Sequence, residues 1–503
     1  MGRNAKPGIF APPVRTAQWP AVRRLRESRP MLPCWGPAAA IDSKLPNRHG
    51  AWSLRISSPR EKALLMTPPT DVAASRSEEV VRKHQEYLWP CVTNYYQKPL
   101  VAARGSMQYL WDLEGRRYLD FFGGILTISV GHANPRVTAR VQEQAGRLAH
   151  CSTLYPTEAI VALAEKLAQI TPGALQKSIF TSSGTEANEA AILLARMATG
   201  SYDVVALRQA YSGSSQLAKG VTAHAPYRKA GVISVGIAHA INPYCYRCPL
   251  ELSYPSCEVA CAKDVENLIQ TATSGAPAAF IAEPIQGVGG FITPPPEYFK
   301  IVFKIVKQYG ALFISDEVQT GFGRTGRKWF GIEQWEITPD MITCAKGLAN
   351  GAPVGATITT AELANSYQGM NISTFGGNPV TSVAARATIE VIEEENLLEN
   401  AHAVGAYFRT GLEALKEKHS LIGDVRGMGL MQALELVKDR TTKEPAPKET
   451  VALMERAREN GLLIGKGGLY GNVIRLAPML NISRSDVDEA LRILDRSFSE
   501  LRP

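Results

Sequence analysis

The sequence predicts an α/β protein in which a large domain, built on a mostly parallel sheet between helices, is followed by a smaller α+β domain. Amphipathic stretches alternate with short, almost wholly apolar segments at 178–181, 204–207, 278–282, 311–315 and 341–344. Strands that are apolar along their whole length are typical of sheets covered on both faces, and strand–helix alternation favours parallel pairing. After about Gly376 longer helical stretches take over, which indicates the second domain.

The individual elements follow from their patterns. Residues 108–122 alternate apolar and polar side chains around Glu114-Gly115, which predicts a hairpin. Residues 297–308 place apolar side chains on one face and lysines on the other, as an amphipathic helix does. Four further elements belong to the second domain: helices at 380–394 and 402–419, and strands at 429–435 and 473–476.

The charge of the 503-residue chain, +8 in all, is concentrated at its N-terminus. Residues 1–60 contain nine Arg and two Lys against two acidic residues, whereas the remaining 443 residues contain 44 basic and 45 acidic ones. An enzyme of nucleic acids carries its basic surface on the folded domain, so the near-neutral body argues against that class. The sequence has no apolar run long enough for a transmembrane helix.

We interpret residues 1–65 as a basic leader that is disordered or absent from the mature protein, with Met66 as the natural start. Nine of the 32 prolines lie between Pro7 and Pro59, where they would break an amphipathic helix. The body is therefore expected in the cytoplasm. The Arg-rich, acid-poor composition leaves a mitochondrial targeting segment as the alternative, and a basic arm that binds a partner as another.

Three polar motifs follow candidate strands, at the sheet edge where α/β proteins bind ligands. Ser183-Gly184-Thr185 leads into an Ala-rich stretch, and such a helix start either binds phosphate or is simply capped. Asp316 would face either a cationic ligand or a salt-bridge partner. Lys346 is either a Schiff-base former or a solvated loop lysine. A phosphate cradle, an acid and a lysine in this order are what pyridoxal phosphate needs.

Over more than 80% of its length, from about Tyr87 onward, the chain resembles the class III pyridoxal-phosphate-dependent aminotransferases of fold type I. The motifs that carry the resemblance are Ser183-Gly-Thr-Glu-Ala, Glu283-Pro-Ile-Gln-Gly, Asp316-Glu-Val-Gln-Thr-Gly-Phe-Gly-Arg-Thr-Gly, Ala345-Lys-Gly, Ser373-Thr-Phe-Gly-Gly-Asn-Pro and Arg475-Leu-Ala-Pro.

The resemblance implies a large domain with a seven-stranded sheet at 131–375 and a small domain at 376–503. The segment 66–130 would pack with the small domain.

The resemblance also implies roles for matching residues. Lys346 matches the lysine that binds the cofactor as a Schiff base, and Asp316 matches the partner of the pyridine nitrogen. Arg475 matches the arginine that grips the substrate α-carboxylate, and Glu283 matches an acid of the pocket that can pair with an arginine there. Thr374 matches a threonine that reaches the phosphate of the neighbouring subunit, which implies a homodimer with shared active sites.

The other implied cofactor contacts surround the ring and the phosphate. Where the family usually has an aromatic residue followed by His-Gly, this chain has Tyr211-Ser212-Gly213, so any role of that histidine is in doubt. The ring contacts are Tyr211 and Val318 on its faces and Gln319 at its hydroxyl, and the phosphate contacts are Ser183, Gly184 and Thr185.

Four of the eight cysteines cluster in an insertion at 241–262, with the spacing C-x2-C-x8-C-x3-C: Cys245, Cys248, Cys257 and Cys261. Four thiols at such spacing predict a structural zinc site or an iron–sulfur cluster. A disulfide-capable loop and inert reduced thiols are the alternatives, and none of the three takes part in amino transfer.

The expected function is ping-pong transfer of an amino group from an amino acid to a 2-oxo acid. The sequence is most similar to the alanine–glyoxylate aminotransferase 2 branch, notably around Asp120-Phe-Phe-Gly-Gly-Ile and Gly131-His-Ala-Asn-Pro. Acetylornithine, ornithine and 4-aminobutyrate transaminases share the same catalytic residues. Aminomutase or decarboxylase chemistry, or cofactor binding without catalysis, would be further possibilities on this fold.

Overall fold

The computed structural model describes residues 70–229 and 235–501. The chain divides into two units, Met1–Met66 and Thr67–Pro503, and every described residue belongs to the second. The predicted leader, residues 1–65, lies outside the described residues.

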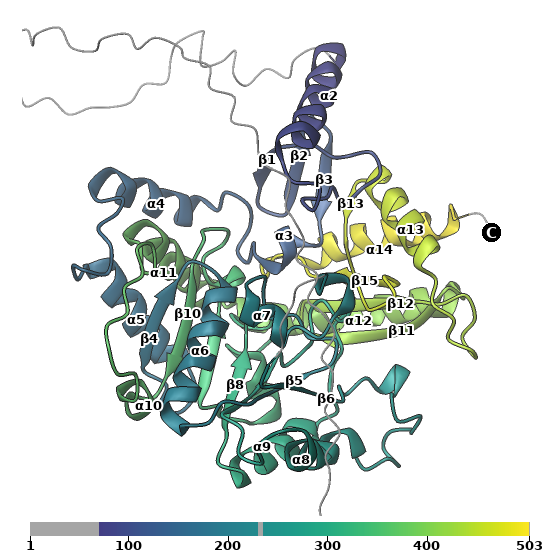
Figure 1. Ribbon diagram of the computed structural model, residues 1–503. Coiled ribbons are helices and arrows are strands. Elements are labelled where there is room, and N and C mark those ends of the chain that lie inside the picture. The colour runs from purple at the N-terminus through teal and green to yellow at the C-terminus, as the bar shows by residue number, and fades with distance from the viewer. Residues whose placement is uncertain (1–69, 230–234, 502–503) are drawn as a thin grey trace, which may run out of the picture. The chain divides into compact units, whose positions relative to one another are not determined.

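Seven strands form the large sheet, in the order β4-β10-β9-β8-β7-β5-β6 (Figure 1). Strand β10 is antiparallel to both of its neighbours, and the remaining paired strands are parallel. The predicted α/β class with a mostly parallel seven-stranded sheet is confirmed. The strands are β4 Lys177–Thr181, β5 Val204–Leu207, β6 Ile237–Ala240, β7 Ala279–Ala282, β8 Leu312–Asp316, β9 Met341–Cys344 and β10 Gly355–Thr359.

Both faces of this sheet are covered, which explains its uniformly apolar strands. Val204 and Ala206 belong to one buried cluster with the Ala-rich helix α6 (Gly184–Thr199). Val205 and Leu207 point the other way, into the larger core that includes α9 (Tyr298–Gln308). The period of two along each strand therefore supplies side chains to two separate helix layers. Further helices of this part are α4 Pro135–Arg147, α5 Glu158–Ile170, α7 Gln216–Val221, α8 Ala260–Ala272 and α10 Ala361–Asn365.

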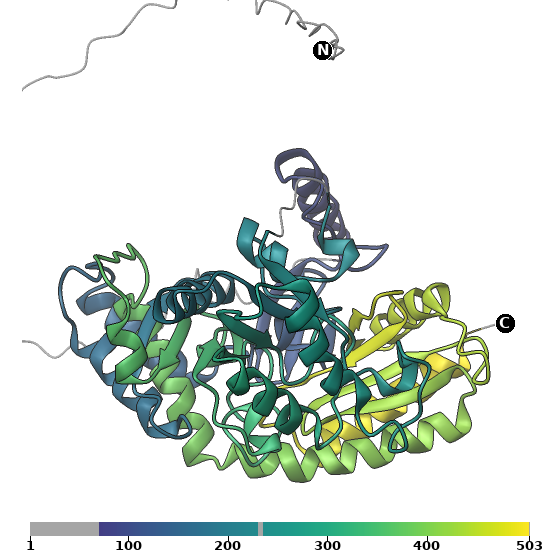
Figure 2. The same cartoon turned by 60° about the horizontal axis from the view of Figure 1, so that its bottom comes forward.

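The C-terminal part forms a second, antiparallel sheet in the order β11-β12-β15-β14. Helix α11 (Pro379–Glu394) packs on α4 and α5, whereas α12 (Leu397–Lys418) packs on β11, so the two helices run from the large sheet to the C-terminal one (Figure 2). The other elements are β11 Ile422–Met428, β12 Met431–Leu436, α13 Pro447–Glu459, β14 Gly465–Gly467, β15 Val473–Leu476 and α14 Arg484–Ser499.

The predicted N-terminal hairpin is present and belongs to a third sheet. Strands β2 (Tyr109–Asp112) and β3 (Arg117–Asp120) pair antiparallel. Strand β3 also pairs in parallel with β13 (Leu462–Leu463), far along the chain. The remaining elements here are α2 Thr70–Tyr87, β1 Ala102–Ser106 and α3 Gly123–Leu126.

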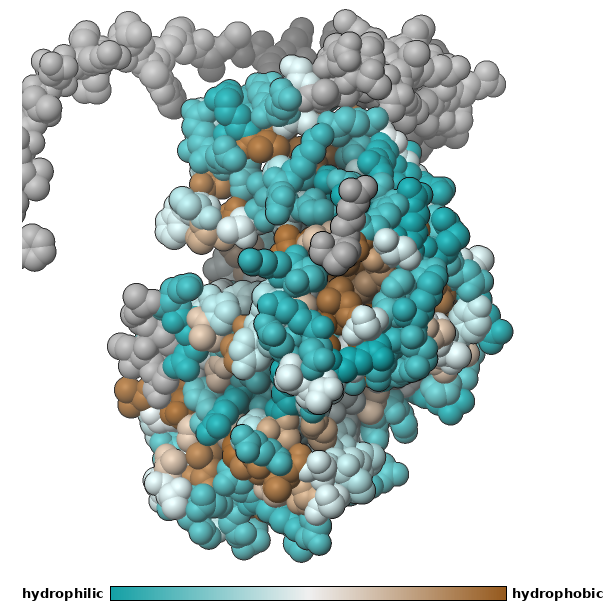
Figure 3. Space-filling model, turned by 90° about the vertical axis from the view of Figure 1, so that its right-hand side faces the viewer, coloured by the Kyte–Doolittle hydropathy of each residue, from teal (hydrophilic) through white to brown (hydrophobic). Residues whose placement is uncertain are grey.

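The surface seen in Figure 3 is mostly hydrophilic, and its hydrophobic residues form separate patches. Within the described ranges, no helix is long and apolar enough to cross a membrane.

Candidate active site

Five strands of the large sheet end beside one pocket of about 160 Å³. Because β5, β7, β8 and β9 are parallel neighbours, the residues that follow them reach the same edge. The wall contains eight predicted residues, namely Gly184, Thr185, Tyr211, Glu283, Asp316, Val318, Gln319 and Lys346, together with the unpredicted Asn188, Ser212, Gly213 and Ala345.

Asp316 is the last residue of β8 and is 2% exposed. Its Oδ2 accepts a hydrogen bond from Asn188 Nδ2 (2.8 Å), and its Oδ1 accepts one from the backbone N–H of Val318 (3.2 Å). Burial raises the pKa of this carboxyl, although both hydrogen bonds and the nearby Lys346 counteract the rise. A buried acid held by amide donors on one side is suited to a cationic ligand on the other.

Asn188 is a site residue that the sequence analysis missed. It lies in α6, and besides Asp316 its Nδ2 donates to the carbonyl of Ser212 (2.9 Å). Its Oδ1 accepts from the hydroxyl of Thr343 on β9 (2.6 Å). The only signal in the sequence was a polar residue on the buried side of an Ala-rich helix, and the identity of its partners comes from tertiary packing.

Lys346 follows β9 with a left-handed φ of 42°, which is uncommon for a side chain other than glycine. Burial lowers the pKa of its amine, while Asp316 and Glu283 oppose this shift and Arg475 adds to it. A lysine whose charged form is disfavoured is able to act as a nucleophile and as a proton carrier near neutral pH.

Glu283 follows β7 and connects two loops of the pocket. Its Oε1 accepts from the backbone N–H of Tyr211 (3.1 Å), and its Oε2 accepts from that of Gly287 (2.8 Å). Burial, and then the Asp316 charge, raise the pKa of Glu283 to about 8, so in the cofactor-free chain it is mostly protonated at neutral pH.

The start of α6 forms one end of the pocket. Ser183 is the N-cap, and its hydroxyl accepts from the backbone N–H of Glu186 (3.2 Å), which leaves the hydroxyl proton able to donate to a phosphate. A side chain at Gly184 would come within 2.9 Å of Val318, and one at Gly213 within 2.5 Å of the Thr185 hydroxyl. The two glycines therefore leave backbone exposed beside a helix N-terminus, where anions bind.

Gln319 carries an unsatisfied polar atom. Its side chain is 6% exposed and lies against Gly287, and its Oε1 is buried without a hydrogen-bond partner. Tyr211 lines the same pocket, with its ring packed edge-on against Tyr227 at 5.0 Å between centroids. An unpaired acceptor in the wall is consistent with a ligand that donates a hydrogen bond.

Arg475 does not line this pocket but is joined to it. It lies on β15, 4% exposed, between the rings of Phe122 and Phe291. Its Nε donates to the carbonyl of Lys466 (3.0 Å) and its Nη1 to that of Gly287 (3.4 Å). Among the residues described, no carboxylate forms a salt bridge with it.

Thr374 is the one predicted contact that the structure places away from the others. It is exposed, in a loop whose neighbours Met370, Ile372 and Phe375 are also exposed, by 86, 52 and 64%.

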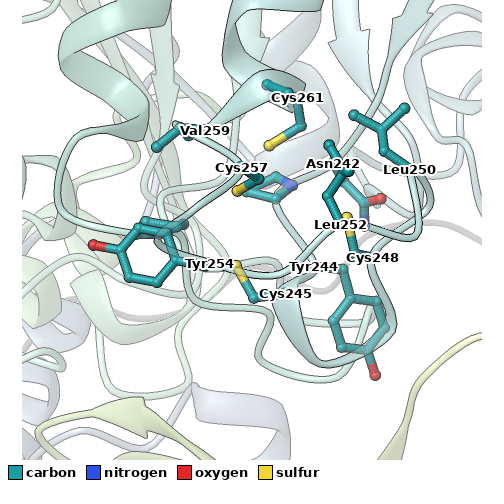
Figure 4. A pocket seen from close by; sticks show the side chains of 13 residues that line it. Asn242, Tyr244, Cys245, Cys248, Leu250, Leu252, Tyr254, Cys257, Val259 and Cys261 are labelled. Carbon is teal, nitrogen blue, oxygen red and sulfur yellow. The ribbon is translucent and has the colours of Figure 1, made fainter.

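The four clustered cysteines line a small separate cavity of about 20 Å³, with their sulfur atoms spread around its wall (Figure 4). Across residues 70–229 and 235–501, no group of three or more His, Cys, Asp or Glu side chains is placed to hold a metal ion. The prediction of a zinc or iron–sulfur site at Cys245, Cys248, Cys257 and Cys261 is therefore not supported.

Comparison with known proteins identifies the family of this site. Residues 92–498 match the family model described as aminotransferase class-III. The chain belongs to the class III aminotransferases. Alanine–glyoxylate aminotransferase 2 homolog 2, mitochondrial, of Arabidopsis thaliana is 44% identical over 436 residues, which cover 86% of this chain and 90% of that protein.

Two further similarities cover the same part of the chain. Leucine/methionine racemase of Thermococcus litoralis is 39% identical over 430 residues, covering 85% of this chain and 96% of that protein. An aminotransferase of Bacillus anthracis, known from its crystal structure, superimposes with a TM-score of 0.80 at 31% identity, covering 85% of this chain and 99% of that one. The predicted family and enzyme class are thus confirmed.

Class III aminotransferases use pyridoxal phosphate, and the pocket of this aminotransferase fits that cofactor. Asp316 is a buried carboxylate whose hydrogen bonds come from amide groups alone. Gln319 offers an unpaired acceptor. Gly184 and Gly213 keep the helix start clear of side chains, as a phosphate group requires.

Proposed function

We propose that this aminotransferase transfers the amino group of alanine to glyoxylate, with Arg475 as the group that binds the substrate carboxylate. The observation that carries the α-carboxylate assignment is the guanidinium itself, which is buried and held by two backbone carbonyls without an acidic partner among the described residues. A desolvated guanidinium that has no acidic partner binds a carboxylate strongly. The choice of alanine and glyoxylate is supported by the name of the 44% identical plant relative.

Each wall residue has a separate task in holding the cofactor. Gly184 and Thr185 at the start of α6 would bind the phosphate, Lys346 would bind the aldehyde, and Asp316 would face the ring nitrogen. When bound, pyridoxal phosphate supplies an aldehyde that takes the amino group and a ring that accepts the electron pair released at the substrate carbon.

Lys346 and Asp316 control the protons of this reaction. Asp316, fixed by Asn188 at 2.8 Å, keeps a proton on the ring nitrogen because its buried negative charge stabilises the cation. Lys346, with its lowered pKa, removes the proton from the substrate carbon as a base and returns a proton as an acid. Both steps occur on the side of the pocket where β8 and β9 end.

Lys346→Ala tests the assignment of the lysine. We expect loss of turnover and of the visible absorbance of the bound cofactor, while Lys300→Ala, an exposed lysine of α9, changes neither. Normal turnover in Lys346→Ala would refute the role.

A panel of amino donors with glyoxylate, pyruvate and 2-oxoglutarate tests the substrates, with chiral analysis of the recovered amino acid. The expected result is fastest transfer from alanine to glyoxylate. Preferred use of acetylornithine, ornithine or 4-aminobutyrate would replace the substrate assignment. Formation of the D-amino acid without 2-oxo acid would show racemisation, and release of carbon dioxide would show decarboxylation.

We propose a homodimer in which Thr374 reaches the phosphate site of the partner subunit. Its support is the exposure of Thr374 within an apolar surface loop. Light scattering should give twice the monomer mass, and Thr374→Val should lose activity. Mixing refolded Lys346→Ala and Thr374→Val subunits should restore part of it, because one of the two sites in a mixed dimer has both residues. No recovery from folded dimers would refute the shared site.

We propose the mitochondrion as the compartment, rather than the cytoplasm first expected. The support is the Arg-rich, acid-poor leader and the mitochondrial designation of the plant relative. Cell fractionation with N-terminal sequencing of the native protein tests this, and a mature protein in the cytosolic fraction would refute it.

A further inference from the structure

One residue, Gly287, is hydrogen-bonded to both Glu283 and Arg475. The N–H of Gly287 donates to Glu283 Oε2 (2.8 Å), and the carbonyl of the same residue accepts from Arg475 Nη1 (3.4 Å). The segment from Glu283 to Gly290 therefore determines how far the acid and the guanidinium are apart.

This segment is a tight turn that excludes side chains. The N–H of Gly290 donates to the Gly287 carbonyl (3.2 Å), which thus receives two hydrogen bonds. Gly290 has φ +104°, and a side chain there would come within 2.9 Å of Val473. At Gly287 a side chain would come within 2.2 Å of Gln319. The turn therefore tolerates no side chain at these positions, and because glycine is conformationally free its geometry depends on contacts at its far end.

Arg426 on β11 holds that far end. Its Nε donates to the carbonyl of Gly290 (2.8 Å), although the two residues are 136 positions apart. Its Nη1 donates to Asp424 Oδ2 and to Glu435 Oε2, each at 2.7 Å, and its Nη2 contacts the hydroxyl of Tyr244 (3.2 Å). The guanidinium is therefore fixed on three sides and points its Nε at the turn.

Glu435 is the centre of this support. Its side chain is fully buried on β12 and also accepts hydrogen bonds from the Tyr244 hydroxyl and from Arg247, both in the cysteine-containing insertion. Breaking a buried ion pair leaves an uncompensated charge, so such a cluster keeps its geometry. The cluster connects the insertion, the C-terminal sheet and the turn, yet none of its members lines the cofactor pocket.

We propose that Arg426 is a positioning residue for carboxylate recognition. By holding the Gly290 carbonyl it fixes the turn on which Glu283 and Arg475 are both hydrogen-bonded, and so it orients the guanidinium toward the substrate. This inference rests on the proposed role of Arg475. It predicts that Arg426 acts on substrate affinity and leaves the proton-transfer residues Lys346 and Asp316 unaffected.

Arg426→Lys is the informative variant, because it retains the positive charge between Asp424 and Glu435 but loses the planar set of donors that also reaches Gly290. The matched control is Arg409→Lys. Arg409 on α12 donates to the carbonyl of Gly427 (2.9 Å), the neighbour of Arg426 on the same strand. The control thus loses a comparable bond to a backbone carbonyl without touching the turn.

The cofactor-loaded enzymes are compared by kcat, by KM for the amino acid and the 2-oxo acid, and by the dissociation constant of propanoate, a carboxylate that cannot react. For Arg426→Lys we expect both KM values and the propanoate constant to rise about tenfold, the range of a hydrogen bond to a charged group, with kcat within about twofold. Arg409→Lys should match the wild type in all of them.

Unchanged KM and propanoate binding in Arg426→Lys would overturn the proposal, as would equal effects in both variants. If Arg426→Lys does not fold, the same measurements are made on Tyr244→Phe, because this variant removes one contact of Arg426. It should raise the same constants about threefold, and unchanged constants would overturn the proposal. Propanoate binding that is unchanged when Arg475 is replaced, or that is absent from the wild type, would instead contradict the proposed role of Arg475.

Discussion

Glu283 makes the stability of the cofactor-free enzyme depend on pH in a way that can be isolated. Its pKa rises from 4.5 to about 8, chiefly through burial. Between these values the folded protein keeps a proton that the unfolded chain releases, so the free energy of unfolding falls as the pH rises. Each pH unit corresponds to about 1.4 kcal/mol, so the interval from about pH 5.5 to about pH 7.5 carries about 3 kcal/mol.

Glu283→Gln removes this titration and keeps one carbonyl oxygen for the N–H of Tyr211 or Gly287. Its amide NH2 group faces the other N–H, which costs about 1 kcal/mol. At about pH 5.5, one unit above 4.5, the proton that the folded wild type keeps already costs it about 1.4 kcal/mol. We therefore expect the two proteins to be about equally stable there, and the variant to be the more stable one by about 3 kcal/mol at about pH 7.5. Other buried acids that do not interact with Glu283, such as Glu317, titrate in both proteins and largely cancel from the difference.

The measurement is urea denaturation followed by circular dichroism, with both proteins at one concentration and both pH values. The infrared difference between the two proteins gives an independent measurement: the protonated carboxyl absorbance of Glu283, present only in the wild type, should disappear near pH 8, whereas that of Glu317 is common to both. A stability difference that is the same at both pH values would refute the assignment of a raised pKa to Glu283.

Three further outcomes follow from the site. Asp316→Asn should lower the transamination rate at least about 100-fold with a smaller loss of cofactor affinity by equilibrium dialysis, and an unchanged rate would remove Asp316 from its role. Gly213→Ala, with φ +137° and a Cβ only 2.5 Å from the Thr185 hydroxyl, should cost about 1–3 kcal/mol of stability and release the cofactor more readily. Gly275→Ala, where φ is also positive but no atom lies within 4 Å, should cost stability alone, so equal cofactor loss in both would contradict the steric argument. Elemental analysis should find zinc and iron well below one equivalent per chain. One equivalent of either would contradict the conclusion that the four clustered cysteines hold no metal.

The local sequence pattern was sufficient to predict the functional residues that directly follow buried strands. The predicted strands 204–207, 341–344 and 473–476 coincide with β5, β9 and β15. Asp316 and Lys346 were found because polar residues directly after apolar strands are conspicuous, and parallel pairing of β8 with β9 then brings them together. Strand β10 escaped prediction because Gly355–Thr359 contains Gly and Thr instead of a continuous apolar run, and its place in the sheet comes from pairing with β4 and β9.

The sequence by itself determined the fold class, the family motifs and the order of the residues around the cofactor, because these depend on short-range periodicity and on spacing within single loops. Only the tertiary structure decided which side chains hold the residues around the cofactor in place. Asn188 meets Asp316 across 128 positions and Arg426 meets Gly290 across 136, and no local pattern encodes a contact of that separation. The cysteines show the converse: their spacing suited a metal, but whether four sulfur atoms converge on one point depends on how the whole insertion packs.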